Sequence, residues 1–145
     1  MRKLIVCVAA AALLAPAALA LPRAMHPTLG ATLLGKNEVP KGSPTAHGIV
    51  NLNLKSGAGQ VCWTFQLAGV SQPLAAHIHK GRAGVSGPVF IALGKTYKAK
   101  GCVSAPKKMI EAVESNPNGY YVNVHNAKFP GGIVRGTLVA GMVHM

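Results

Sequence analysis

Two histidines separated by a single residue, His77 and His79, are the strongest sign of chemistry in this chain. On a β-strand, residues i and i+2 point to the same side, so we expect both imidazoles on one face as a chelating pair. Neutral imidazole binds Zn²⁺, Cu²⁺ and Ni²⁺, and copper usually has the highest affinity. A third histidine, His125, lies in another strand-like segment. If the two strands are neighbours, the three histidines form a metal site with copper as the candidate cofactor; the alternative is that they are solvated or hydrogen-bonded parts of the scaffold.

Arg135 follows His125 after a turn that contains Pro130. If the turn centres on Pro130, Arg135 lies directly across from His125 on the next strand. A cation there would disfavour protonation of His125 and would attract an anion to the site. We therefore predict an anion-guiding or supporting role for Arg135. The alternative is that Arg135 is an ordinary strand residue. A different turn length would also shift the register of the two strands by one residue.

The usual sequence motifs of enzymes are absent. The chain has no Walker loop, no GxGxxG after a strand, no HExxH and no GxSxG. It has three acidic residues, and a hydrolytic triad would depend on Glu38, which nothing else in the sequence supports. Whether the protein is an enzyme stays open, with a non-catalytic role favoured over a hydrolase.

The chain has three cysteines, and removal of a predicted leader that contains Cys7 would leave two, Cys62 and Cys102. In an exported chain such a pair predicts a disulfide, which contributes about 4 kcal/mol for a loop of this length. The alternative is two buried free thiols.

Alternation of apolar and polar residues recurs along the chain, with Gly- and Pro-rich turns between the segments. The predicted strands are residues 28–34, 50–54, 61–67, 74–79, 89–93, 120–124 and 133–139, and residues 95–102 form a basic strand or loop. The second and third strands form a hairpin around a turn at residues 57–59.

One segment is helical: Ser104 is the predicted cap, Pro106 fits the first turn, and Asn116 marks the end. The fold class is therefore all-β, an antiparallel Greek-key sandwich or barrel with one short helix.

Residues 1–20 have the features of a signal peptide. Arg2 and Lys3 precede an apolar run over residues 4–14, and Ala18-Leu19-Ala20 has the small-x-small pattern of a cleavage site. Cleavage would leave a flexible arm at residues 21–27 and a β domain at residues 28–145, exported to the periplasm or secreted, and not transmembrane after processing. The alternative is an uncleaved N-terminal anchor.

The mature domain is strongly basic. Without Arg2 and Lys3, 13 basic and 3 acidic residues remain, a formal charge of +10. Such a surface attracts anionic partners, and export favours an anionic envelope component or another exported protein over nucleic acid. The alternative is that the charge serves solubility alone.

Five motifs in the same order resemble the CHRD domain family, found repeated in chordin and singly in exported bacterial proteins. They are LGKNEVP at residues 34–40, AHIHKG at 76–81, GPV at 87–89, YYVNVH at 120–125 and FPGGIVRG at 129–136. The likeness extends from about Thr28 to Val139. It implies a CHRD-like all-β domain outside the cytoplasm, and a growth-factor-binding role like that of chordin would be an analogy of fold alone.

A looser similarity concerns copper-zinc superoxide dismutases, in which an HxH pair and a later histidine hold copper and an arginine guides the anion. His77, His79, His125 and Arg135 occur in that order here. The chain has no Asp and no histidine between His79 and His125, so the zinc ligands and the bridging ligand are missing. The resulting hypotheses are a non-catalytic binding module and, alternatively, a copper-binding protein with superoxide-related chemistry.

Overall fold

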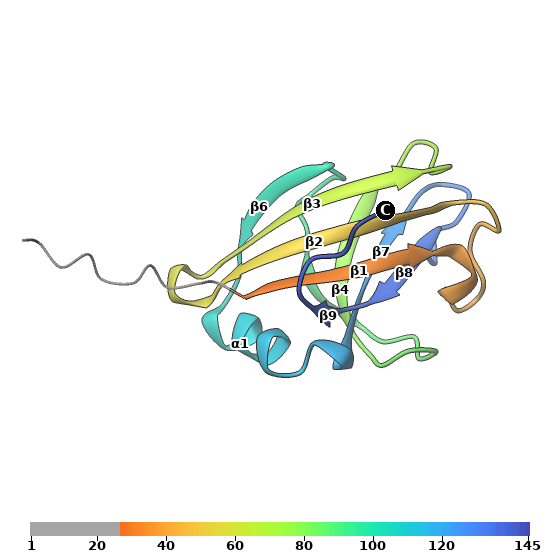
Figure 1. Ribbon diagram of the computed structural model, residues 1–145. Coiled ribbons are helices and arrows are strands. Elements are labelled where there is room, and N and C mark those ends of the chain that lie inside the picture. Colours follow the sequence, from red (N-terminus) through yellow and green to blue (C-terminus); the bar gives the residue numbers. More distant parts are fainter. Residues whose placement is uncertain (1–26) are drawn as a thin grey trace, which may run out of the picture.

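The computed structural model describes residues 27–145 (Figure 1). Its strands are β1 (Thr28–Leu34), β2 (His47–Lys55), β3 (Gln60–Ala68), β4 (Ala75–Lys80), β5 (Val89–Ala92), β6 (Lys100–Ser104), β7 (Tyr120–His125), β8 (Val134–Thr137) and β9 (Val139–Ala140). The helix α1 spans Lys107–Ser115, and short 3-10 turns occupy Gly35–Asn37, Ser56–Ala58 and Pro117–Gly119. The predicted all-β class is confirmed.

All strands belong to one curled antiparallel sheet with the order β5-β4-β7-β8-β1-β2-β3-β6, and β9 pairs with β1 (Figure 1). The sheet has two halves, β5-β4-β7-β8 and β1-β2-β3-β6, and the chain crosses between them three times after β1–β3: from β3 to β4, from β5 to β6, and through α1 from β6 to β7. The second crossing makes backbone contacts with both halves, because Tyr97 N donates to Leu74 O and Phe65 N donates to Ala99 O. The predicted sandwich or barrel is thus realised as one sheet that folds over its own core.

The core lies on one face of this sheet, where the alternating apolar residues meet. Leu52 on β2 lies opposite Trp63 on β3, and both are buried. Ile78 on β4 lies opposite Val122 on β7, and both are fully buried in the same cluster. The other face of β4 and β7 is free to carry polar side chains.

The predicted disulfide is present. Cys62 on β3 and Cys102 on β6 are direct cross-strand partners and are bonded to each other. The bond therefore fastens β6, at one edge of the sheet, to its neighbour.

Two local predictions were wrong. Ser104 is the last residue of β6 and does not cap α1; the residue before the helix is Pro106, and no side chain caps it. The strand predicted at residues 133–139 is two short strands. Leu138 N still donates to Tyr120 O on β7, and the chain then changes partner, since Val139 and Ala140 pair with β1.

The predicted signal peptide and residues 21–26 of the predicted arm lie outside the described residues. Pro27, the last residue of that arm, is tied to the sheet because its carbonyl accepts a hydrogen bond from Leu54 N. Within residues 27–145, no helix has the length and apolar character needed to cross a membrane.

Candidate metal centre

The pairing of β4 with β7 brings the three predicted ligands together on the outer face of the sheet. Antiparallel register places Ala75 opposite His125 and His77 opposite Asn123, so His125 is a diagonal neighbour of His77. One ligand nitrogen from each of His77, His79 and His125 lies within 4.8 Å of the others. His77 Nδ1 and His125 Nε2 are 3.1 Å apart. These three residues are called the histidine group below.

His79 is held in one orientation by a backbone carbonyl. Its Nδ1 lies 2.9 Å from Gly87 O, and because a carbonyl only accepts, the imidazole proton is on Nδ1. Nε2 therefore carries a lone pair, and it is buried with no hydrogen-bond partner among residues 27–145. A buried polar atom without a partner costs free energy unless a ligand satisfies it.

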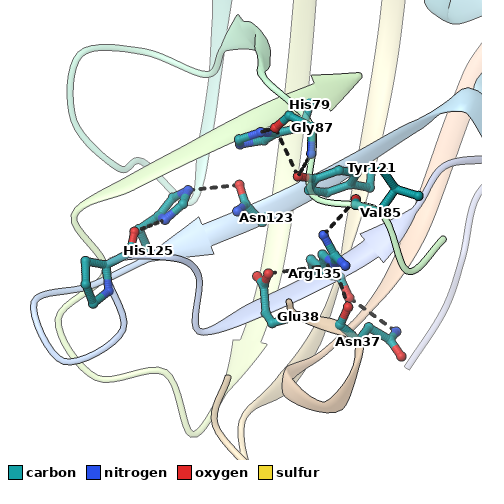
Figure 2. A network of polar contacts seen from close by, with 10 residues as sticks. Asn37, Glu38, His79, Val85, Gly87, Tyr121, Asn123, His125 and Arg135 are labelled. Carbon is teal, nitrogen blue, oxygen red and sulfur yellow. Dashed lines mark hydrogen bonds and ion pairs between the residues drawn. The ribbon is translucent and has the colours of Figure 1, made fainter. Parts of the chain in front are cut away.

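His125 is oriented in the same way at the turn after β7 (Figure 2). Its Nδ1 lies 2.8 Å from Pro130 O, while its Nε2 lies 3.0 Å from the side-chain oxygen Oδ1 of Asn123. Asn123 itself is 2% exposed and lies between His79 and His125. A backbone carbonyl at the second ring nitrogen is the usual companion of a metal-binding histidine, because it fixes the tautomer and the ring direction.

The environment of His77 and His79 favours the neutral form of both imidazoles. Burial lowers the pKa of His77 to about 4, helped by the nearby His125 and His79. Burial also lowers the pKa of His79. The hydrogen bond to Gly87 and the nearby Asn123 side chain oppose this shift, while His125 and Arg135 reinforce it. Neutral imidazole is the form that binds metal, so protons compete weakly for His77 and His79 at neutral pH.

The spacing is close to that of a shared metal ion. Two nitrogens that each lie 2.0–2.1 Å from one metal are at most about 4.2 Å apart. His77 Nδ1 and His125 Nε2, 3.1 Å apart, already meet this limit. The three ligand nitrogens lie within 4.8 Å of one another, so they would need to move together only slightly to share one ion. The predicted juxtaposition is thus present, while metal ligation by these residues stays a prediction.

Another histidine, His47, is not part of the histidine group. It is exposed at the start of β2 and contacts Thr45 O in its own loop.

The predicted register of Arg135 was wrong. Arg135 lies opposite Asn123, because the turn after β7 is centred on Phe129 and not on Pro130. The shift of two residues keeps Arg135 on the same face as the histidines but moves it along the sheet.

The Arg135 side chain makes its contacts away from the histidines (Figure 2). Its Nε donates to Asn37 O and its Nη1 to Val85 O, and it pairs with Glu38 at 3.7 Å. The guanidinium lies 4.6 Å from the centre of the Tyr121 ring. His79 stacks on the same ring at 4.9 Å, so Tyr121 separates Arg135 from the histidine group.

Glu38 is the polar residue that sequence reasoning underrated. It is 3% exposed and packs against Gly132, where any Cβ would overlap its carboxylate. Burial raises the pKa of Glu38 to about 7, although Arg135 and the backbone N–H of Val39 oppose the shift. The available signal was weak: Glu38 is the one acidic residue of the sequence that lies outside α1.

A family model for the CHRD domain matches residues 29–138 of this chain. The match covers the sheet from β1 to the end of β8, including the histidine group and Arg135. No curated protein and no solved structure matches the chain.

Proposed function

Because this chain belongs to the CHRD domain family, we propose that it is a non-catalytic binding module whose histidine group holds a transition-metal ion, copper in preference to zinc. The observation that carries the proposal is His79 Nε2, a buried lone pair with no partner in residues 27–145, beside two further imidazoles. Copper is preferred because nitrogen sites bind Cu²⁺ more tightly than the other divalent first-row metals.

The orientation of the rings supports the same conclusion. His79 and His125 each direct Nδ1 at a backbone carbonyl. His79 Nε2 is left without a partner within residues 27–145, whereas His125 Nε2 contacts Asn123 Oδ1 and His77 Nδ1, and a bound metal would have to replace these contacts. Both carbonyls come from loops beside the sheet, at Gly87 and Pro130. The arrangement would therefore be formed before the metal arrives, and little conformational entropy would be lost on binding.

We also propose that the protein works in the periplasm or outside the cell. The signal-peptide pattern of residues 1–20 and the Cys62–Cys102 disulfide support this, since disulfides persist in oxidising compartments. N-terminal sequencing of the protein recovered from periplasm or medium should begin at Leu21. A cytoplasmic protein that retains Met1 would contradict the proposal.

Calorimetric titration with Cu(II) and Zn(II) tests the metal site. We expect one copper ion per chain and a loss of affinity beyond about a hundredfold in a His77→Ala/His79→Ala/His125→Ala variant, because even outer partners of a metal site are worth 10–100-fold. His47→Ala/His144→Ala is the matched control and should bind copper like the wild type.

Two further measurements keep this test decisive. Urea unfolding shows whether the triple variant is folded; if it is not, His125→Ala alone serves, since His125 is partly exposed. Equal copper affinity in the wild type and in a folded variant would refute the proposed site.

A further inference from the structure

A pocket of about 500 Å³ lies on the far side of Tyr121 from the histidine group. It is lined by buried Glu38, Tyr121 and Arg135 and by exposed Lys36, Lys41 and Arg82. Its volume is within the range of small-molecule sites. It is called the Arg135 pocket below.

The charge of the lining is one-sided. Lys36, Lys41, Arg82 and Arg135 are cations, and Glu38 is the single carboxyl among the lining residues. Cations gathered around a concave surface with low-dielectric walls raise the local concentration of anions. The same pocket also offers apolar contact from Val39 and Pro40.

Arg135 gives this pocket a specific donor in addition to its general charge. The residue is 3% exposed, and its Nε and Nη1 are taken by the carbonyls of Asn37 and Val85. Its Nη2 is buried and finds no acceptor within residues 27–145. A buried guanidinium N–H without a partner is costly, and an oxyanion is the acceptor that a guanidinium binds best.

Glu38 limits what can bind. One of its oxygens, Oε2, lies near Arg135, while Oε1 has no hydrogen-bond partner in the described part of the chain. An ionised Glu38 would repel an incoming anion, so binding is expected to strengthen when this carboxyl is protonated or replaced. Because Nη2 is buried, an anion reaches it only if part of the pocket lining moves, and the exposed segment at Arg82–Gly84 belongs to that lining.

We propose that the Arg135 pocket binds a small oxyanion, either free or carried on a sugar-sized molecule. Arg135 would contact the oxyanion, and Lys41 and Arg82 would attract it. The site is separate from the histidine group and does not depend on metal.

Titration of the ¹⁵N-labelled, disulfide-bonded protein, followed by NMR in metal-free buffer, tests the proposal. The probes are inorganic phosphate, glucose 6-phosphate, glucuronate and, as the neutral control, glucose. We expect saturable shifts at residues 36–41, 82–84 and 135–137 with the anionic probes, none with glucose, and weaker binding at higher salt. Tighter binding of the two sugar anions than of phosphate would assign the ligand to the sugar-borne class, and equal binding to the free anion.

Variants locate the binding. Lys41→Ala/Arg82→Ala should weaken affinity about tenfold, the size of lost charge-assisted contacts, and Glu38→Gln should strengthen it. Lys98→Ala/Lys100→Ala removes the same charge from exposed positions near and on β6 and should leave affinity unchanged.

Three results would overturn the inference: no saturable binding by about 10 mM, weaker than ordinary specific affinities; equal shifts with glucose; or equal weakening in both double variants. The His77→Ala/His79→Ala/His125→Ala variant should still bind the anion, so a failed metal site and a failed anion site are distinguishable.

Discussion

The histidine group and the Glu38–Arg135 pair lie on the same outer face of β4, β7 and β8, yet their polar atoms are satisfied differently. In the histidine group, loop carbonyls hold Nδ1 of His79 and of His125, and His79 Nε2 is left without a partner within residues 27–145. In the pair, backbone carbonyls and Glu38 take up most of the Arg135 donors. The first arrangement points a lone pair at a shared space, while the second fastens two loops to the sheet.

The difference shows that residue type does not fix the role of a buried polar group. His79 and Arg135 contact opposite sides of one ring, that of Tyr121 (Figure 2). Both also depend on the loop at residues 81–87, because Gly87 O holds His79 and Val85 O holds Arg135. The two regions are therefore separate in ligand chemistry but share their support.

Loss of Arg135 should have the largest effect on the free energy of unfolding. Such a loss would show that the Glu38–Arg135 pair stabilises the fold. We expect Arg135→Met to lower the free energy of unfolding by about 3 kcal/mol, the low end of the cost of breaking a buried pair, because Glu38 can take up a proton. His125→Ala should cost about 1 kcal/mol. Urea unfolding of both variants measures this contrast, and equal losses would remove it. Glu38→Gln/Arg135→Met should recover part of the Arg135→Met loss.

The pH dependence of stability should separate the two regions by sign. Glu38 has a pKa raised from 4.5 to about 7, so its contribution is full below pH 4.5 and is lost as the pH rises to 7. His77 has a pKa lowered from 6.5 to about 4, so its contribution is full above pH 6.5 and is lost as the pH falls to 4.

Between pH 4.5 and 6.5 these two contributions oppose each other. Relative to the metal-free wild type, Glu38→Gln should gain about 3 kcal/mol as the pH rises from 4.5 to 7. His77→Gln should gain about 2 kcal/mol as the pH falls from 6.5 to 4, after allowance for its partial exposure. Urea unfolding across this range checks both slopes. Parallel curves for a variant and the wild type would show that the group concerned does not titrate with folding.

Changes in the shared support should have the smallest effects and should test the link between the regions. A Cβ at Gly87 would overlap the Lys80 carbonyl, so Gly87→Ala must displace the loop and its bond to His79. We expect copper affinity to fall about 10-fold or more. Tyr121→Phe keeps the ring but loses the hydroxyl that accepts a hydrogen bond from Gly87 N. This loss should lower the free energy of unfolding by about 1 kcal/mol or less. Calorimetry with copper and NMR titration with glucose 6-phosphate measure both sites; an effect of Gly87→Ala on copper alone would show that the regions are independent.

Local patterns predicted most of the fold. Alternation in β2 and β3, around Leu52 and Trp63, marked a half-buried hairpin because one face of each strand must be apolar. The segment at 120–125 was found for the same reason. The prediction failed at Ser104, where a good capping residue lies inside a strand because pairing with Gln60 outweighs its local preference.

The sequence by itself determined an all-β domain with a Cys62–Cys102 pair and placed His77 and His79 on one side of a strand, because strand geometry alone decides that. Whether His125 lies beside them depends on which strands are neighbours. The position of Arg135 along the sheet depends on the residue at which one turn is centred. The buried pairing of Glu38 with Arg135 joins residues 97 positions apart in the chain. Only the tertiary structure decided these, because no local preference records the loop contacts that leave His79 Nε2 unsatisfied and hold Arg135 in place.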